Sequence, residues 1–321
     1  MLWGAIKKLH KSGLLGINCR NANYTLKYNL RKRYPLVDDK LLTKAIAIRA
    51  GLSVPDLYAV VEFQHQIESL PDLLSGYSEF AVKPSRGSGG NGIVVISGRI
   101  RERLRKAGGQ LVSMDDLKFH VHNILSGMFS LGGQQDKAMF EYRVRFDPVF
   151  EPVTFQGVPD LRIIVFLGFP TMAMVRLPTM MSGGKANLHQ GAIGVGIDMA
   201  TGRTLNAVWR NEVIEEHPDT GNPVGGIQIP HWEKLLRLAA ECYELTGLGY
   251  IGVDLVLDAT RGPLILELNA RPGLSIQLAN HRGLLPRLKK VESVCQDLAD
   301  IDARVNFSMN HFRHSTLQSA L

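Results

Sequence analysis

Cysteine is scarce in this sequence. Only Cys19, Cys242 and Cys295 occur in 321 residues, and their odd number and wide separation exclude a disulfide framework. The same spacing excludes a cysteine-rich zinc site. Few, scattered cysteines are typical of proteins in a reducing compartment, so we expect a cytoplasmic protein.

Long apolar runs are also missing. No stretch reaches the roughly 18 to 20 uninterrupted apolar residues that a membrane span needs. The first residues lack the apolar core and cleavage site of a secretory signal. Hydrophobic residues nevertheless make up 45% of the chain, which is typical of a folded globular protein. A chain of 321 residues suits two or three packed subdomains.

Acidic residues are absent before Asp38. The same segment contains these basic residues: Lys7, Lys8, Lys11, Arg20, Lys27, Arg31, Lys32 and Arg33. They account for the net charge of +7, so the rest of the chain is close to neutral. A basic body that coats nucleic acid is therefore not indicated, and we expect no specific nucleic-acid partner.

The start of this basic segment has the period of an amphipathic helix. Its apolar arc, opposite the lysines, comprises Leu2, Trp3, Ala5, Ile6 and Leu9. Two interpretations stay open for residues 1–13. The helix packs on the protein's own body and exposes its lysines, or it docks on an anionic membrane surface or an acidic protein partner.

Hydrophobic periodicity divides the remainder into helices and short strands. We expect helices over residues 38–50, 115–130 and 231–246. We expect strands over residues 80–83, 93–96, 139–144, 162–167, 172–177, 192–197, 251–257 and 264–268. From about Val291 the pattern fades, and the last residues are expected to form a loosely held tail.

The glycine-rich segment Pro84 to Gly92 lacks what two common nucleotide motifs require. It matches G-x-G-x-x-G, but it runs into a strand where a dinucleotide fold would need a helix. No G-x-x-x-x-G-K-[ST] sequence or kinase motif is present. The segment is therefore the tip of a hairpin. Its backbone N–H groups can approach phosphate, and the alternative is a flexible hairpin that binds nothing. Lys83 on the preceding strand, and Lys40 on the first long helix, add charges suited to phosphates.

Two carboxylates lie inside apolar strands near the end of the chain. Asp254 and Glu267 would be costly there without partners, and adjacent antiparallel strands can place both on one face with Asn269. Such hard oxygen ligands suit Mg²⁺. The alternative is an internal salt bridge with Arg162 or Arg271.

In order along the chain, several short motifs resemble the ATP-grasp superfamily. Within it, the chain is similar to the ribosomal-protein-modifying glutamate ligase branch and its α-L-glutamate ligase-related proteins, from about Leu14 to Leu288. The motifs are Val37-Asp38-Asp39-Lys40, Val82-Lys83-Pro84-Ser85-Arg86-Gly87, Asp160-Leu161-Arg162, Lys185-Ala186-Asn187-Leu188-His189 and Glu267-Leu268-Asn269-Ala270-Arg271-Pro272-Gly273. Residues 215–230 resemble instead the sugar-transfer-associated ATP-grasp proteins.

The resemblance implies a nucleotide site. Its phosphate contacts would be Lys40, Lys83, Ser88, Gly89 and Gly90. Glu141 and Tyr142 match the hinge that borders adenine, and Asp160 matches a position near the ribose. The implied cofactors are ATP and Mg²⁺, with two metal ions expected and Mn²⁺ as a substitute; the matching metal ligands are Asp254, Glu267 and Asn269.

The resemblance also implies residues for the reaction itself. Arg162 and Arg271 would hold a substrate carboxylate or an acyl-phosphate. Lys185 and Asn187 match an Arg-x-Asn segment beside the transferred phosphate, although Lys in place of Arg removes a bidentate fork.

The implied fold is the ATP-grasp fold of the α/β (α+β) class, with the nucleotide held between two α+β subdomains. The expected organisation is a basic extension over 1–35, an ATP-grasp domain over 36–290 and a tail over 291–321. Within the ATP-grasp domain, we expect a lid at about 80–140 and a metal-binding part at about 141–290. Only about 35 residues precede Leu36, too few for the full N-terminal domain that such ligases carry.

The implied activity is an ADP-forming carboxylate–amine ligase that acts through an acyl-phosphate and adds glutamate or another amino acid to an acceptor. Its partners would be small-molecule or peptide acids and amines, and the oligomeric state stays open. The alternatives are an ATP-grasp phosphotransferase and a non-catalytic ATP-binding partner protein.

Overall fold

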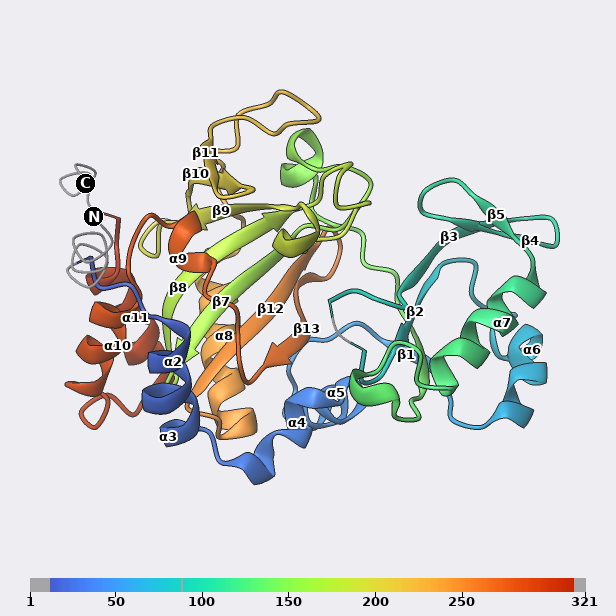
Figure 1. Cartoon of the computed structure of the whole chain (residues 1–321), viewed down its shortest axis with the longest axis horizontal. Helices are drawn as coiled ribbons and strands as arrows, with labels where there is room; N and C mark the ends of the chain where they lie inside the picture. Colours follow the sequence, from blue (N-terminus) through green and yellow to red (C-terminus); the bar gives the residue numbers. More distant parts are fainter. Residues whose placement is uncertain (1–11, 88, 315–321) are drawn as a thin grey trace. The chain divides into compact units, whose positions relative to one another are not determined.

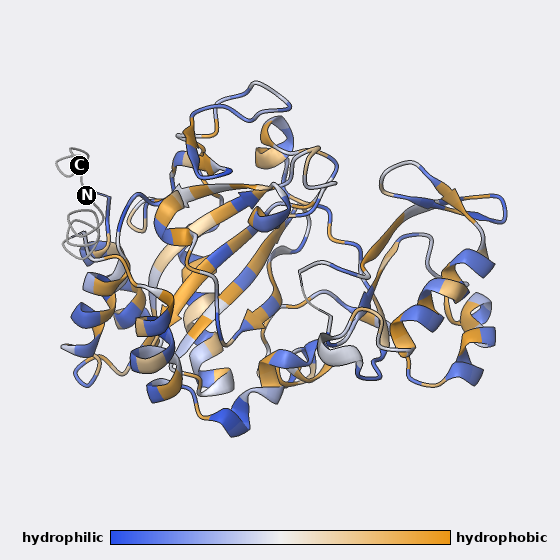
Figure 2. Cartoon of the chain, viewed as in Figure 1, coloured by the Kyte–Doolittle hydropathy of each residue, from blue (hydrophilic) through white to orange (hydrophobic). Residues whose placement is uncertain are grey.

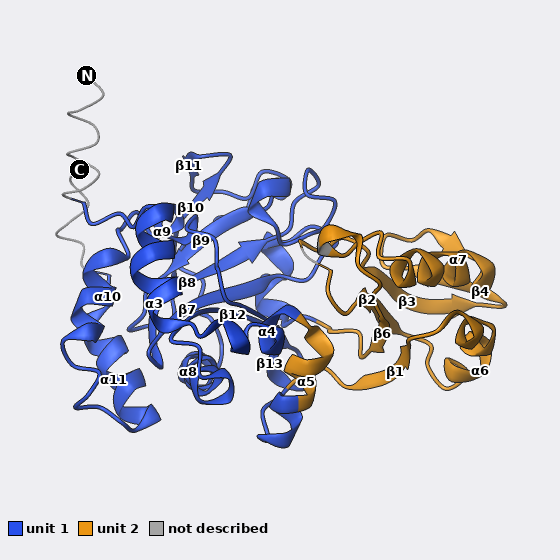
Figure 3. Cartoon of the chain, turned by 60° about the horizontal axis from the view of Figure 1, so that its bottom comes forward, with its two compact units in different colours: residues 1–38, 46–53, 146–321 blue, residues 39–45, 54–145 orange. Residues whose placement is uncertain are grey.

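A computed structural model describes residues 12–87 and 89–314 of the chain. These residues divide into two compact units, shown in different colours in Figure 3. The small unit contains residues 39–45 and 54–145, and the large unit contains the described parts of 1–38, 46–53 and 146–321. The amphipathic helix predicted for residues 1–13 lies almost entirely outside the described residues.

The small unit contains an antiparallel sheet with the strand order β1-β6-β2-β3-β4-β5 (Figure 1). Its strands are β1 (Leu57–Val61), β2 (Phe80–Pro84), β3 (Val94–Ile100), β4 (Arg103–Lys106), β5 (Leu111–Val112) and β6 (Ala138–Glu141). Its helical segments are the start of α5 (Lys40–Arg49), η3 (Gln64–Ser69), α6 (Leu70–Leu73), α7 (Met114–Leu125) and η4 (Leu131–Gly133).

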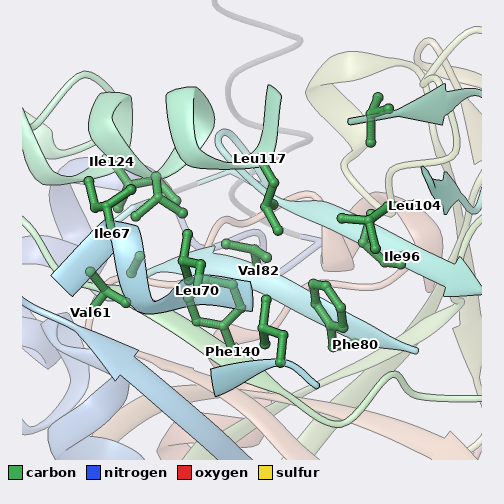
Figure 4. Packing of buried hydrophobic residues seen from close by; sticks show 14 of the residues in the cluster. Val61, Ile67, Leu70, Phe80, Val82, Ile96, Leu104, Leu117, Ile124 and Phe140 are labelled. Carbon is green, nitrogen blue, oxygen red and sulfur yellow. The ribbon is translucent and has the colours of Figure 1, made fainter. Parts of the chain in front are cut away.

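The core of the small unit fixes which way the β2 and β6 side chains point. Val82 and Phe140 are partners in the register and belong to one buried hydrophobic cluster, part of which is shown in Figure 4. Leu117, Val121 and Ile124 of α7 contribute to the same cluster at helical spacing. Successive strand residues alternate between faces, so the neighbours of Val82 and Phe140 project from the opposite face of the sheet.

The large unit contains a seven-stranded antiparallel sheet with the order β11-β10-β9-β8-β7-β12-β13. The strands are β7 (Asp160–Phe166), β8 (Phe169–Leu177), β9 (Ile193–Ile197), β10 (Thr204–Trp209), β11 (Glu212–Ile214), β12 (Tyr250–Asp258) and β13 (Gly262–Asn269). Hydrophobic residues dominate β7, β8 and β12 in Figure 2 because helices cover this sheet.

Helices pack on both faces of this sheet. The longest, α8 (Trp232–Thr246), packs against β7, β8, β12 and β13 and lies behind the sheet in Figure 1. In front lies α9 (Ile276–Ala279), which contacts β8, β9 and β10. A Cβ atom on Gly196 of β9 would lie 2.4 Å from the Ala279 carbonyl oxygen, so glycine is required for this close approach.

The other helical segments of the large unit are short. They are α2 (Ile17–Cys19), η1 (Arg20–Thr25), α3 (Leu26–Tyr28), η2 (Arg31–Arg33), α4 (Pro35–Asp38), η5 (Pro148–Val153), η6 (Leu188–Gln190), α10 (Leu285–Glu292) and α11 (Ile301–His311). Among the described residues, no helix is long and apolar enough to cross a membrane.

The end of the described chain differs from the expected loose tail. Helix α11 packs on α8 and β8, with Val305 and Phe312 buried. The sequence does not reveal this helix because other buried positions of α11 are polar: Arg304 is 4% exposed and Ser308 is fully buried. A helix without an apolar stripe lacks the periodicity by which sequence analysis recognises packing.

Two predicted helix boundaries need correction. The helix expected over 115–130 ends at Leu125, because Gly127 has a left-handed φ of 84° and sits against the Gln134 backbone. The helix expected over 38–50 consists of two segments, α4 and α5, which meet at Asp39. The predicted α+β class is confirmed, and both sheets are antiparallel.

Candidate functional site

The glycine-rich segment of the small unit is the tip of the β2–β3 hairpin, as predicted. Gly89, Gly90 and Gly92 have φ values of 64°, 77° and 76°, a left-handed conformation that glycine adopts without steric cost. Gly89 is exposed, and Ser88 lies outside the described residues. These left-handed glycines lack a Cβ atom, which is the property that the predicted approach of backbone N–H groups to phosphate requires.

The base of this hairpin is held by buried polar contacts. The Asp39 carboxylate accepts a hydrogen bond from the Ser85 hydroxyl at 2.5 Å, and the Asp136 carboxylate accepts from the Arg86 N–H at 3.0 Å. Lys40 Nζ donates to the Gly87 carbonyl at 2.5 Å. The structure therefore brings Lys40 to the glycine loop, where the sequence predicted a phosphate contact.

A second group of charges, which we call the lysine cluster, comprises Lys44, Lys83 and Glu141. Lys83 forms an ion pair with Glu141, and Lys44 Nζ lies 3.1 Å from the same carboxylate. Burial alone would raise the pKa of Glu141, but the two ammonium groups more than offset it and lower that pKa. The carboxylate is thus ionised and orients both lysines on the sheet face opposite the hydrophobic core.

The Glu141 carboxylate is therefore paired with two lysines. The next residue, Tyr142, contacts a different part of the small unit. The Tyr142 N–H donates to the Asp56 carbonyl at 2.8 Å. Tyr142 also lines a cavity of about 230 Å³ in which Glu79 pairs with Arg143 and Arg145. The Glu141 carboxylate and the Tyr142 N–H thus both have partners within the small unit.

In the large unit, charged side chains of four strands, β7, β8, β12 and β13, lie close together. We call Asp160, Arg162, Arg176, Asp254 and Glu267 the carboxylate cluster. The register pairs Asp254 with Arg162 on one side and with Glu267 on the other, so all three share one face. Arg162 donates to both oxygens of Asp254 at 2.5 Å. Arg176 bridges Asp160 and Asp254, donating to the latter at 2.8 Å.

Burial affects the two aspartates of this cluster differently. It raises the pKa of Asp160 to about 6, and the Arg176 guanidinium only partly opposes the shift. Burial would raise the pKa of Asp254 as well, but Arg162 and Arg176 together hold it below the ordinary value. Asp254 is therefore the more firmly ionised of the two carboxylates.

The donor set at Asp254 fits a hard divalent cation. Asp254 Oδ2 accepts from Arg162, Arg176 and, at 3.4 Å, the Asn269 amide, whereas Oδ1 accepts from the Arg162 Nε–H alone among these donors. A carboxylate oxygen has two lone pairs, so Oδ1 retains capacity for a metal. Glu267 lies directly opposite, and Asn269 follows on the same face.

The sequence allowed an internal salt bridge with Arg162 or Arg271 as an alternative to metal binding. Asp254 forms this salt bridge with Arg162, whereas Arg271 stacks on the Tyr34 ring. Among the described residues, no three His, Cys, Asp or Glu side chains gather as a metal group, so a metal here would need the Asn269 oxygen. Mg²⁺ commonly takes only one or two carboxylates and fills its other positions with water and phosphate oxygens. The residues present are therefore compatible with Mg²⁺ bound together with a nucleotide.

Lys185 and Asn187 lie in the segment that leads into η6. Asn187 Oδ1 accepts from the His189 N–H at 3.0 Å and caps this short helix, while Lys185 is exposed. The next residue, Leu188, would lie 2.8 Å from a Cβ atom on Gly194, the register partner of Arg176. The segment therefore runs over the sheet face that carries the carboxylate cluster.

Arg271 lies in the loop that follows β13. Its guanidinium is exposed and stacks over the Tyr34 ring at 5.1 Å. Pro272 covers Gly252 of β12, where a Cβ atom would lie 2.6 Å from the Pro272 Cβ. Since Gly252 and Asp254 share one face, this loop also covers the face of the carboxylate cluster.

Sequence analysis missed Lys44 and Arg176. Lys44 follows Lys40 by one helical turn, a spacing at which two lysines can serve one site. Arg176 is a charged residue inside the apolar run of β8, the same kind of signal that identified Asp254.

Comparison with known families places these residues in context. A family model described as sugar-transfer associated ATP-grasp matches residues 19–293. No curated protein matches this chain.

Solved structures similar to this chain include three ATP-grasp ligases. PsnB with a minimal precursor, Mg and ADP is 16% identical over 84% of this chain and 62% of that chain, with a TM-score of 0.43. D-alanine–D-alanine ligase from Bacillus anthracis with ATP is 14% identical over 88% and 68%, with a TM-score of 0.45. A RiPP-associated ATP-grasp ligase from Chryseobacterium gregarium, solved with ADP and a leader and core peptide, is 12% identical over 86% and 64%, with a TM-score of 0.47. The chain thus spans less than two thirds of the length of PsnB.

Proposed function

Because this chain belongs to the sugar-transfer associated ATP-grasp family, we propose that it is an ADP-forming carboxylate–amine ligase that uses ATP and Mg²⁺. The observation that carries the proposal is the arrangement of buried charge. The lysine cluster gathers two ammonium groups in the unit that carries the glycine hairpin, and β12 and β13 place Asp254, Glu267 and Asn269 on one sheet face. Ammonium groups suit phosphates, and converging carboxylate and amide oxygens suit a divalent cation.

The proposed roles follow from these charges. Lys83 and Lys40 bind the nucleotide phosphates beside the glycine hairpin of Gly89 and Gly90. The Asp254, Glu267 and Asn269 side chains hold Mg²⁺, which neutralises phosphate charge when it is bound. Glu141 keeps Lys83 oriented, and its neighbour Tyr142 borders the adenine. Asp160 lies near the ribose.

The chemistry consists of two transfers. A substrate carboxylate oxygen attacks the γ-phosphorus, the bond to the β,γ-bridging oxygen breaks, and ADP and an acyl-phosphate form. An amine then attacks the acyl carbon, and phosphate leaves as the amide forms. Arg162, Arg271, Lys185 and Asn187 hold the carboxylate and the transferred phosphoryl group. Positioning and charge neutralisation supply most of the rate enhancement, so the proposal needs no dedicated general base.

The identity of the two substrates is the finer part of the proposal. We propose an amino acid such as glutamate as one substrate and a small-molecule or peptide acceptor as the other, in a reaction that takes place in the cytoplasm. The support for the amino acid is the motif resemblance of Lys83-Pro84-Ser85-Arg86-Gly87 and Glu267-Leu268-Asn269 to glutamate ligases. The three free, scattered cysteines support the location.

Hydroxylamine trapping tests this function without knowledge of the natural amine. The full chain is incubated with Mg²⁺, ATP, hydroxylamine and one acid from a panel of amino acids and peptides that includes glutamate. The proposal predicts hydroxamate, ADP and phosphate in equal amounts with at least one acid, and none of them with Glu267→Gln. Phosphate transferred to a hydroxyl or sugar would instead establish a phosphotransferase. Tight ATP binding without turnover would establish a non-catalytic ATP-binding protein.

A further inference from the structure

Residues 13–34 of the large unit form a continuous segment that we call the N-terminal arm. Its Tyr24 and Tyr28 rings pack edge-on against Phe166 of β7, at 5.4 and 4.9 Å between ring centroids. Tyr24 also lies 6.2 Å from the ring of Tyr250, the first residue of β12. Phe166 and Tyr250 are partners in the register, so the arm covers one end of the β7–β12 pair.

The arm shares a sheet face with the carboxylate cluster. Along β12, Tyr250, Gly252 and Asp254 point to the same side because strand side chains alternate. The arm covers Tyr250, and Pro272 covers Gly252. Asp254 follows, with Arg162 and Glu267 beside it. The arm, the loop of residues 270–273 and the charged side chains therefore follow one another along a single strand.

Two buried side chains of the arm bind the backbone of this loop directly. Arg20 is 7% exposed, and its Nη1 donates to the Pro272 carbonyl at 2.7 Å. Asn29 donates to the Ala270 carbonyl at 3.1 Å and to the Tyr250 carbonyl at 2.7 Å, and it accepts from the Tyr250 N–H at 2.9 Å. Two alternate carbonyls of the loop are thus hydrogen-bonded to the arm.

The arm also contacts the one guanidinium in this loop. Arg271 stands over the face of the Tyr34 ring, near the end of the arm. The contacts from Arg20 and Asn29 hold the backbone on either side of Arg271, and Tyr34 holds the side chain. Burying an arginine is costly unless its guanidinium has hydrogen-bond acceptors. The buried Arg20 guanidinium donates to a carbonyl of the loop, so it does more than fill space.

We infer that the N-terminal arm is a positioning element of the site, which fixes the 270–273 loop and the direction of the Arg271 guanidinium. Arg20, Asn29 and Tyr34 act through Arg271 and do not themselves touch substrate. The consequence for catalysis rests on the proposed function, in which Arg271 holds a substrate carboxylate or an acyl-phosphate. The effect on the order of the 270–273 loop does not rest on the proposed function, so the structural and the catalytic effect can be tested separately.

Hydrogen–deuterium exchange of the amides at Ala270, Arg271, Gly273 and Leu274 measures the order of the loop. Arg20→Met removes the donor to Pro272 and should speed exchange at these amides about tenfold. Arg33→Met is the matched control, because Arg33 lies on the same arm but donates to Thr246 at 3.0 Å. Equal exchange in wild type and Arg20→Met, or the same acceleration in Arg33→Met, would overturn the inference.

A second pair of variants tests the Arg271 side chain itself. Phenylglyoxal modifies exposed guanidiniums, and peptide mass spectrometry gives the rate at Arg271. Tyr34→Leu should raise that rate about two- to fivefold, while Tyr34→Phe, which keeps the ring face, should restore the wild-type rate. Equal rates in Tyr34→Leu and wild type would contradict the inference even if Arg20→Met does not fold.

The catalytic consequence is read from the hydroxamate assay with whichever acid supports it. Tyr34→Leu should raise the KM for the acid about two- to fivefold and leave the KM for ATP unchanged, with rescue by Tyr34→Phe. A rise in the KM for ATP, or loss of kcat alone, would contradict positioning through Arg271. If no acid is turned over, the proposed function fails, while the exchange and labelling results still decide the role of the arm.

Discussion

The lysine cluster of the small unit and the carboxylate cluster of the large unit are both ion-pair groups on a sheet face, but they suit opposite ligands. In the lysine cluster, the ammonium groups of Lys44 and Lys83 share Glu141. In the carboxylate cluster, Arg162 and Arg176 pair with Asp254 and Asp160, and Glu267 lies opposite Asp254 in the register. Buried pairs alone are weak evidence for function, so the informative feature is the ligand that each group suits: phosphate for the ammonium groups, and a metal for the carboxylate and amide oxygens.

The largest expected effect is loss of activity when the carboxylate cluster loses a proposed metal ligand. Glu267→Gln should lower ADP release by about three orders of magnitude, because a bound metal supplies several kcal/mol of charge stabilisation. Asp254→Asn should abolish ADP release and also reduce the free energy of unfolding by about 3–5 kcal/mol, since it leaves two buried guanidiniums poorly paired. Steady-state ADP release and urea denaturation measure the two effects.

Asp258→Asn provides a control on the same strand. Asp258 is as buried as Asp254, but it caps the β12–β13 turn through the Thr260 and Arg261 amides. Asparagine can still cap a turn, so ADP release should stay near the wild-type rate. Normal turnover in Glu267→Gln would contradict the assignment of the carboxylate cluster to the metal.

The next effect concerns ATP affinity in the lysine cluster. Lys83→Met removes one ammonium group but leaves the Lys44–Glu141 pair intact, and it should weaken ATP binding about 10- to 100-fold. Calorimetric titration with a non-hydrolysable ATP analogue measures the dissociation constant. Lys118→Met is the control, because Lys118 pairs with Glu68 on the surface of the same unit. An unchanged dissociation constant for Lys83→Met would contradict the assignment of this cluster to phosphate.

Glu141 of the lysine cluster and Asp160 of the carboxylate cluster should make pH-dependent contributions to stability of opposite sign. The Glu141 pKa is lowered in the folded state, so its contribution to stability is complete above its unfolded pKa and is lost in acid below about pH 4.5. The Asp160 pKa is raised to about 6, so the folded state binds more protons than the unfolded state below that pH. Its contribution is therefore greatest in acid and falls as the pH rises through 6.

Variants without each carboxyl group isolate these contributions. The stability of wild type relative to Asp160→Asn should fall by about 1–3 kcal/mol as the pH rises from about 4 to 7. Relative to Glu141→Gln, the stability of wild type should fall as the pH drops below about 4.5. Urea denaturation across this range gives both differences, and slopes of the same sign would contradict the opposite pKa shifts of Glu141 and Asp160.

The smallest expected effect is at Lys40. Its ammonium donates to the Gly87 carbonyl at the hairpin base and lies outside the lysine cluster. We expect Lys40→Met to weaken ATP binding only about two- to fivefold, the range of an exposed charge pair. A loss as large as that of Lys83→Met would mean that the phosphates lie nearer the hairpin base than the lysine cluster.

Sequence patterns and the family resemblance predicted most strands of the fold and every member of the two clusters except Lys44 and Arg176. Asp254 and Glu267 were recognisable because a charge inside an apolar strand requires a partner, and Lys83 because it precedes a glycine hairpin. Which partner each charge takes depends on register, as Arg176 shows: it lies on β8, reaches Asp160 on β7 and extends to Asp254 on β12. Pairing across three strands has no signature in a single sequence.

The role of the N-terminal arm was hidden for a different reason. Arg20 and Asn29 are polar residues of a basic segment for which the sequence indicates no burial, yet they are 7% and 4% exposed. Their partners are backbone carbonyls more than 220 positions away along the chain. Backbone carbonyls are present at every residue, so composition and spacing cannot identify which ones accept these hydrogen bonds.

Binding of Mn²⁺ in the presence of ADP, followed by electron paramagnetic resonance, tests the assignment of the two clusters to phosphate and metal most directly. Wild type should convert free Mn²⁺ to a protein-bound form only when ADP is added. Glu267→Gln should bind ADP through the intact lysine cluster but leave the metal free, and Lys83→Met should weaken binding of ADP and metal together. Equal Mn²⁺ binding by wild type and Glu267→Gln would contradict the assignment of the carboxylate cluster to the metal.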